Sequence, residues 1–239
     1  MKKISFILSI ITVTAVVLFL TASTKKQMQV IHTANADEKG FAVLELFTSQ
    51  GCSSCPPADE LLGKYAMQNN KHIIPLAFHV DYWNRLGWID SFSNSKYAQR
   101  QRDYASTFAS QSVYTPQLVI NGAKEMIGSD ADKIALAVNN TLKESPSVTL
   151  SVADIGINNN TISFNYKAAG SIANMLVHAV LVQAKVFTNI KAGENRGLKL
   201  TNYNVVRDFV TTDKAAADGK FLLQLPAGAN SAGFNIVLL

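Results

Sequence analysis

The sequence lacks most of the motifs that identify a well-known chemistry. It has no phosphate-binding glycine loop, no H-E-x-x-H zinc motif and no G-x-S-x-G nucleophile motif. Only two of its 239 residues are cysteines, and there is neither a second CxxC pair nor a cluster of methionines. Charged residues make up only 16% of the chain and hydrophobic residues 48%. We therefore expect a packed globular protein rather than a disordered one.

The chain also lacks a basic stripe of the kind that binds nucleic acid. Its formal net charge is +5, but four of its 22 basic residues lie within residues 1–36, which contain no acid. The other 18 basic side chains nearly balance the 17 acidic ones. The charge therefore comes from the N-terminus, and we expect no nucleic-acid partner.

The N-terminus has the pattern of an export signal. Lys2 and Lys3 precede an uncharged apolar run over residues 4–20, and Ala34-Asn35-Ala36 fits the A-x-A cleavage pattern. At about 17 residues, the run is also near the minimum for a membrane span. Residues 1–36 are therefore predicted to be a signal peptide or an N-terminal membrane anchor. Both predictions place the folded part in the periplasm or cell envelope, where disulfides persist.

The pattern of apolar residues changes near residue 145. Before it, short apolar strands alternate with helical stretches; the strands are expected at 41–47, 73–80, 117–121 and 124–127, and the helices at 58–68, 93–110 and 130–143. After it, nearly every segment has the pattern of a strand; these are expected at 148–155, 161–167, 175–187, 198–211, 220–225 and 234–239. We predict an α/β domain over residues 37–144 and an all-β, antiparallel, sandwich-like domain over residues 145–239.

Both cysteines lie in one stretch, TSQGCSSCPPADELL, where two serines separate Cys52 from Cys55. A pair with this spacing, just past a strand and at the start of a helix, is typical of thioredoxin-type redox centres. Helix N-terminal N–H groups stabilise a thiolate, so Cys52 is the expected nucleophile and Cys55 the resolving thiol. A proline beyond the first helical turn removes a backbone hydrogen bond. Either the helix begins near Pro56, or Pro57 makes its first turn irregular.

Sixty residues further on, Thr115-Pro116 leads directly into a strand and an Asn121-Gly122 turn. With CxxC upstream, this resembles the thioredoxin superfamily, in which a cis-proline faces the cysteines. The resemblance implies a cis Thr115–Pro116 bond and a thioredoxin-like fold, with Pro116 in the catalytic site and Thr115 contacting substrate.

The chain is also similar to an exported bacterial thioredoxin-like family labelled domain of unknown function 1223. The stretches that carry this similarity are ELFTSQGCSSCPPADELL, FHVDYWNRLGW, YTPQLVING and GENRGLKLTNYNVVR. They lie in both halves of the chain. The family implies a thioredoxin-like fold with a β-rich C-terminal part, and no established reaction.

Glu45 is a further candidate for the site. It lies within an apolar strand, where a carboxylate is costly unless it is paired or protonated. Thioredoxins carry a buried acid in a comparable place, so the resemblance implies that Glu45 relays protons for the second cysteine. The alternative is a glutamate paired with a lysine or arginine.

Asp81 and Trp83 follow the second predicted strand, at the sheet edge where ligands bind in such folds. We predict that they contact substrate; alternatively, Trp83 packs the domain and Arg85 pairs with Asp81 or Asp90. In the second half, Gly193 to Gly197 (GENRG) is expected to be an ordinary hairpin turn; alternatively, it docks against the cysteines or binds an acidic ligand.

The leading hypothesis is a cell-envelope thiol–disulfide oxidoreductase that exchanges with protein thiols or disulfides and needs no cofactor or metal. One alternative is a Cu(I)- or zinc-binding or metal-delivery module, in which His79 joins the two thiolates. The other is a non-catalytic thioredoxin-like binding protein with a permanent disulfide. A bond that closes so short a loop adds little through loop entropy, which weighs against a purely structural role.

Overall fold

The computed structural model describes residues 30–31 and 40–239, apart from residues 111, 174 and 215. The predicted signal or anchor over residues 1–36 therefore lies outside the described residues, except for two positions in a short strand. Within the described ranges, no helix is both long enough and apolar enough to cross a membrane.

The described residues form these elements, in chain order. The first part contains β1 (Val30–Ile31), β2 (Ala42–Thr48), α1 (Pro56–Met67), β3 (Ile73–His79), α2 (Ser95–Thr107), β4 (Gln117–Ile120), β5 (Lys124–Ile127) and α3 (Ala131–Thr141). The second part contains β6 (Val148–Asn158), β7 (Thr161–Gly170), β8 (His178–Asn189), β9 (Lys199–Thr211), β10 (Asp218–Gln224) and β11 (Phe234–Leu238). The helices and strands predicted from the sequence after residue 40 are confirmed to within a few residues.

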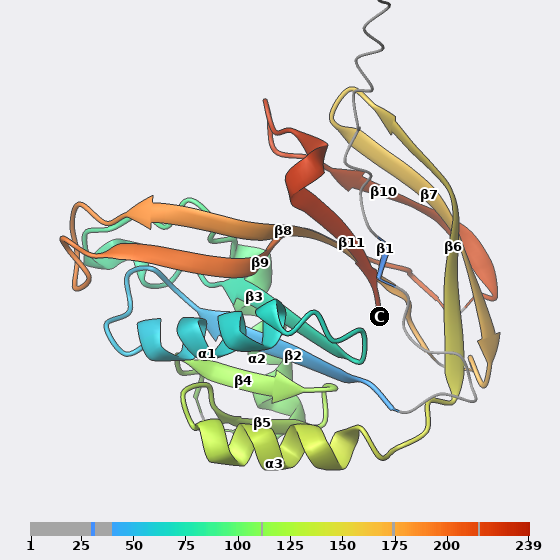
Figure 1. Cartoon of the computed structure of the whole chain (residues 1–239), viewed down its shortest axis with the longest axis horizontal. Coiled ribbons are helices and arrows are strands. Elements are labelled where there is room, and N and C mark those ends of the chain that lie inside the picture. The colour runs from blue at the N-terminus through green and yellow to red at the C-terminus, as the bar shows by residue number, and fades with distance from the viewer. Residues whose placement is uncertain (1–29, 32–39, 111, 174, 215) are drawn as a thin grey trace, which may run out of the picture.

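Most strands belong to one mixed sheet. Its order is β1-β11-β8-β9-β3-β2-β4-β5, and the other three strands form a second sheet in the order β10-β7-β6. The pairs β2/β3, β3/β9 and β1/β11 are parallel, and the other neighbours in the main sheet are antiparallel. Figure 1 shows the main sheet running through the molecule, with the smaller sheet at one end beside β8 and β11.

The predicted fold class, an α/β thioredoxin-like domain followed by an all-β sandwich-like domain, is wrong. The chain is mostly β, and its large sheet takes strands from both halves. Ala77 in β3 pairs with Val205 in β9, and the Asn204 side-chain amide donates to the Pro75 carbonyl at 3.0 Å. These contacts continue the sheet beyond β3, so β8, β9 and β11 extend it instead of forming a sandwich. The boundary at residue 145 stays a prediction.

Helices cover both faces of the central strands. Leu44 and Leu46 of β2 pack with Leu62 of α1, whereas Phe47 of β2 packs with Tyr97 of α2. Figure 1 shows α1 and α2 on opposite faces of the sheet. A strand that is buried on both faces has a continuous apolar sequence, which explains the run AVLELFT in β2. A third cluster fills the space between the two sheets.

Helix α1 and strand β9 approach closely at Gly63. A Cβ atom on Gly63 would lie 2.6 Å from Cδ2 of Tyr203. The absence of a side chain at Gly63 is therefore what lets the first half of the chain pack against the second.

We predict that Gly63→Ala lowers the free energy of unfolding by about 1–3 kcal/mol, because the added methyl group forces the Tyr203 ring to move. Urea unfolding measures the change, with Lys64→Ala on the exposed side of α1 as the control. A gain in stability of about 1 kcal/mol, as for a glycine in an exposed helix interior, would contradict this packing.

Candidate functional site

The site lies where β2 and β3 end and α1 begins. Cys52 and Cys55 form a disulfide there, and neither residue has solvent-exposed surface. Cys55 is the N-cap residue of α1, and the helix begins at Pro56. The sequence allowed either a helix that begins near Pro56 or a helix with an irregular first turn. The first of these two predictions is therefore correct.

The two prolines at the start of α1 change the chemistry of this helix end. They occupy positions N1 and N2, where a backbone N–H would have no partner within the helix. Proline has no N–H, so α1 offers two fewer donors to an anion than an ordinary helix would. The first helical N–H groups, those of Ala58 and Asp59, both donate to the Cys55 carbonyl. The helix end therefore gives a Cys52 thiolate little support.

The structure brings Thr115 and Trp83 to the disulfide. The Thr115 hydroxyl donates to Cys52 Sγ at 3.3 Å, and Trp83 Nε1 donates to the Thr115 hydroxyl at 2.8 Å. The bond between Thr115 and Pro116 is cis, as the superfamily resemblance implied. The Ser54 hydroxyl lies 3.4 Å from Cys52 Sγ. The surroundings of Cys52 are thus neutral hydroxyl groups and the segment before β4.

The structure does not join Asp81 to the disulfide. Asp81 is half-buried at the start of the loop after β3, and its backbone carbonyl accepts a hydrogen bond from the Asn84 N–H. Among the described residues, no hydrogen bond or ion pair connects its carboxylate to a cysteine or to Arg85. The predicted substrate contact of Asp81 stays a prediction.

Glu45 lies on the other face of the sheet from α1. Its neighbours in β2, Leu44 and Leu46, pack towards α1, and side chains alternate along a strand. Its carboxylate accepts two hydrogen bonds from Arg100 of α2, at 2.6 and 2.8 Å, and one from Tyr104 at 2.6 Å. The buried acid that the sequence suggested is therefore present, but it is paired with an arginine and away from the cysteines.

A different acid lies beneath the disulfide. Asp59 is buried on α1, one helical turn after Cys55, so the two side chains share a helix face. Burial raises the pKa of the Asp59 carboxyl from 3.8 to about 7, although His79, Thr48 and Asn202 act in the opposite direction. About half of the Asp59 carboxyls therefore carry a proton at neutral pH.

The polar atoms around Asp59 are incompletely paired. Four buried side-chain atoms of the described residues have no hydrogen-bond partner: Thr48 Oγ1, Asp59 Oδ1, His79 Nε2 and Asn202 Nδ2. The other three residues are those that lower the Asp59 pKa. Unpaired buried polar atoms are rare and costly. Perturbed titratable groups cluster at functional sites, so these residues are part of the candidate site.

His79 is held by Asp90 on its other side. His79 Nδ1 lies 2.7 Å from the Asp90 carboxylate, and both side chains are fully buried. Burial alone would lower the pKa of His79, but Asp90 raises it above its usual value. Burial opposes ionisation of Asp90, yet His79 and the Gln50 N–H keep its pKa below the usual range. In the part of the chain that the structure describes, no three His, Cys, Asp or Glu side chains converge as for a metal ion.

The second half of the chain contributes to this site through the β8–β9 hairpin. The Asn195 amide donates to the carbonyls of Gln50 and Cys52, each at 2.9 Å, and the Glu194 carboxylate accepts from the Ser53 N–H at 3.1 Å. The Gln50 side chain in turn donates to Thr188 at 2.9 Å. The GENRG turn therefore docks against the cysteine loop, which the sequence analysis named as an alternative to an ordinary hairpin turn.

Sequence reasoning missed Asp59, and it named docking of the GENRG turn as an alternative without identifying the partner residues. Helical spacing was the available signal for Asp59, because a residue four positions after Cys55 lies on the same helix face. The partners of Glu194 and Asn195 lie more than 140 residues away along the chain, at Ser53, Gln50 and Cys52. No local pattern identifies contacts of that kind.

We predict that Asp59→Asn changes how stability depends on pH. In wild type the unfolded chain loses this proton near pH 3.8 and the folded chain near pH 7, so unfolding free energy falls as pH rises through that window. Asparagine has no such proton. Between pH 4 and 8 the variant should gain on the order of 1 to 4 kcal/mol relative to wild type.

Urea unfolding at both pH values measures this difference. The control is Asp132→Asn, which changes an exposed aspartate in the first turn of α3. Parallel pH profiles for wild type and Asp59→Asn would show that Asp59 titrates normally.

Comparisons with known proteins identify the family. No curated protein matches the chain. The crystal structure of protein AGR_C_4864 from Agrobacterium tumefaciens is similar, with 27% sequence identity, a TM-score of 0.58 and coverage of 85% of this chain and 96% of that one. HBP35 of Porphyromonas gingivalis shares the fold at 14% identity, with a TM-score of 0.56 and coverage of 85% and 70%. A family model matches residues 43–239, and the chain belongs to that family, described as protein of unknown function (DUF1223).

Proposed function

We propose that the chain is a thiol–disulfide oxidoreductase that exchanges its Cys52–Cys55 disulfide with thiols or disulfides of other proteins. The observation that carries this proposal is the position of the pair. It lies at the start of a helix, and the Thr115 hydroxyl bonds to Cys52 Sγ just before a cis proline. This local arrangement resembles the redox centres of the thioredoxin superfamily. We propose a relationship to that superfamily on this local basis only.

The exchange has two steps. A substrate thiolate attacks Cys52 Sγ, forms a mixed disulfide and releases Cys55 as a thiolate, which takes up a proton. A second substrate thiolate attacks the substrate sulfur of the mixed disulfide and releases Cys52. The products are one substrate disulfide and the reduced pair; in the opposite direction, Cys52 attacks a substrate disulfide and Cys55 resolves the intermediate.

Asp59 supplies the proton that this scheme requires at Cys55. It is buried one helical turn away, and its carboxyl has a pKa of about 7. The released Cys55 thiolate is also buried, and an unpaired buried charge is costly. Transfer of the Asp59 proton leaves the negative charge on a carboxylate that Thr48, Asn202 and His79 surround. This role replaces the one that the sequence suggested for Glu45.

The apolar N-terminal run supports a location in the cell envelope. The proposed partners are therefore exported proteins that carry thiols or disulfides, in a compartment where both forms occur. The same apolar run is the basis for proposing that residues 1–36 are a signal peptide or a membrane anchor.

Burial favours a second candidate, a permanent disulfide in a non-catalytic binding protein. Both cysteines have no exposed surface, and redox-active pairs usually expose the attacking sulfur. The two candidates differ in whether the native protein exchanges its disulfide with an external thiol.

We predict that the reduced wild-type protein accelerates the reduction of insulin by dithiothreitol, and that Cys52→Ser removes this activity. Cys55→Ser leaves the attacking thiol without its resolving partner, so it should accumulate a mixed disulfide. Turbidity follows insulin reduction, and mass spectrometry under non-reducing conditions detects the mixed disulfide. Wild type no faster than Cys52→Ser, together with no mixed disulfide in Cys55→Ser, would support the permanent disulfide instead.

A further inference from the structure

The β8–β9 hairpin covers the disulfide by two different contacts. Asn195 is buried, and its amide holds the carbonyls of Gln50 and Cys52. Glu194, one residue earlier, is exposed, and its carboxylate bonds to Ser53, whose backbone N–H donates to it at 3.1 Å. Asn195 therefore anchors the hairpin, whereas Glu194 can leave its partner without disrupting packing.

The Glu194 carboxylate accepts a hydrogen bond from a backbone N–H of the CxxC loop, that of Ser53. Ser53 directly follows Cys52, so its N–H is among the few backbone donors close to that sulfur. Pro56 and Pro57 supply none. The hydroxyls of Thr115 and Ser54 remain, and neither is charged. The nearest ionised group held on the loop is therefore an anion, which disfavours a second negative charge on Cys52.

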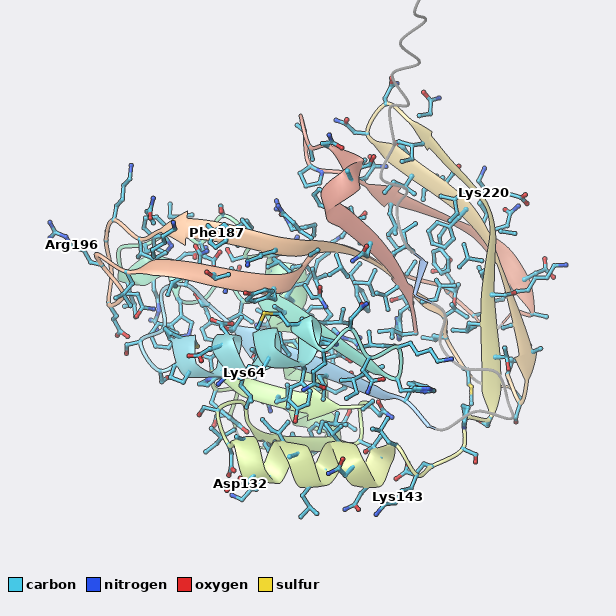
Figure 2. The ribbon with its side chains drawn as sticks, viewed as in Figure 1. Lys64, Asp132, Lys143, Phe187, Arg196 and Lys220 are labelled. Atoms are coloured by element: carbon cyan, nitrogen blue, oxygen red, sulfur yellow. A yellow bond between two sulfur atoms is a disulfide. The ribbon has the colours of Figure 1, made fainter. Side chains whose placement is uncertain are left out.

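Charged and titratable groups of several elements lie around this anion. Arg85, in the loop that packs against Gly51 and Gly193, donates to the Tyr82 carbonyl. Figure 2 shows Arg196 at the outer end of the hairpin, away from the sheet, and it is exposed. The ionisable groups beneath the pair are Asp59 on α1, His79 at the end of β3 and Asp90 in the loop that follows. In this set His79 is paired with Asp90, so no free cation faces Cys52 among these groups.

We propose that Glu194 is a built-in anionic cap on the CxxC loop, which a substrate must displace before Cys52 reacts. The replacing group is a hydrogen-bond acceptor of a polypeptide substrate, such as a backbone carbonyl, that takes over the Ser53 N–H. This inference rests on the proposed exchange reaction and makes Glu194 a positioning residue in it.

The cap acts on a defined chemical step. Reduction of the disulfide by two electrons and two protons gives two thiols, and Cys52 then gives up its proton to water to become the attacking thiolate. With Glu194 in place, that thiolate forms beside a carboxylate and without the Ser53 N–H. With Glu194 displaced, the repulsion is lost and the N–H becomes available to sulfur. Substrate binding and activation of Cys52 are thereby coupled.

The test compares Glu194→Ala and Glu194→Gln with wild type, with Glu60→Gln as the control. Glu60 is an exposed glutamate on α1 that pairs with Lys64, so its substitution makes the same charge change away from the loop. Two quantities are measured: the rate constant for reduction of the disulfide by dithiothreitol, and the pH profile of alkylation of reduced Cys52 by iodoacetamide.

Glu194→Ala should lower the alkylation midpoint of Cys52 by about one pH unit and speed reduction by about tenfold, the factor that corresponds to one pKa unit. Glu194→Gln keeps an acceptor for Ser53 but loses the charge, so its values should lie between those of wild type and Glu194→Ala. Glu60→Gln should match wild type.

An alkylation profile and a reduction rate in Glu194→Ala that equal those of wild type would overturn the cap. Both measurements use small reagents, so they are independent of insulin turnover. A faster reduction in Glu194→Ala with no insulin activity in any variant would support the cap and reject the proposed function.

Discussion

The position of β9 between β3 and β8 determines the rest of the structure. Because β9 pairs with β3, the sheet that begins in the first half of the chain continues into the second, and α1 packs against both halves. The same pairing directs the β8–β9 hairpin along the ends of β2 and β3, where the disulfide lies. Asn195 then holds the cysteine loop through two backbone carbonyls. The site is therefore a product of the whole chain and not of its CxxC segment.

The elements could be predicted from the sequence, but their assembly could not. Apolar runs such as FAVLELF and turn residues such as Asn121-Gly122 are short-range signals. They predicted the positions of the strands and helices to within a few residues. The pairing of β3 with β9 joins residues 128 positions apart at Ala77 and Val205, and no local pattern encodes it. The predicted boundary between an α/β half and a β half rested on a change in the pattern of apolar residues along the sequence. The predicted fold class was wrong because one sheet can take strands from both sides of such a change in sequence pattern.

At the site, too, local features could be predicted from the sequence and long-range contacts could not. The CxxC spacing predicted where the pair lies relative to its strand and helix, and the superfamily resemblance implied the cis Thr115–Pro116 bond. Glu45 drew attention because a carboxylate in an apolar strand is conspicuous, yet Arg100 explains its burial. Asp59 was inconspicuous in the helical stretch ADELL, although its position one turn after Cys55 is a readable signal. Glu194 depends on a contact across 141 residues, so only the fold reveals it.

The central claim is that the buried Cys52–Cys55 disulfide exchanges with other thiols. The reduction potential of the pair tests this claim most directly. The pair lacks two helical N–H groups and faces a carboxylate, so its reduced form gains little from ionisation. Equilibration of the native protein with defined glutathione or dithiothreitol buffers, followed by quenching and mass spectrometry, gives the potential. An exchanging pair predicts a value above about −300 mV, within reach of cellular thiols. A value clearly below that figure would show a permanent structural bond and contradict the account.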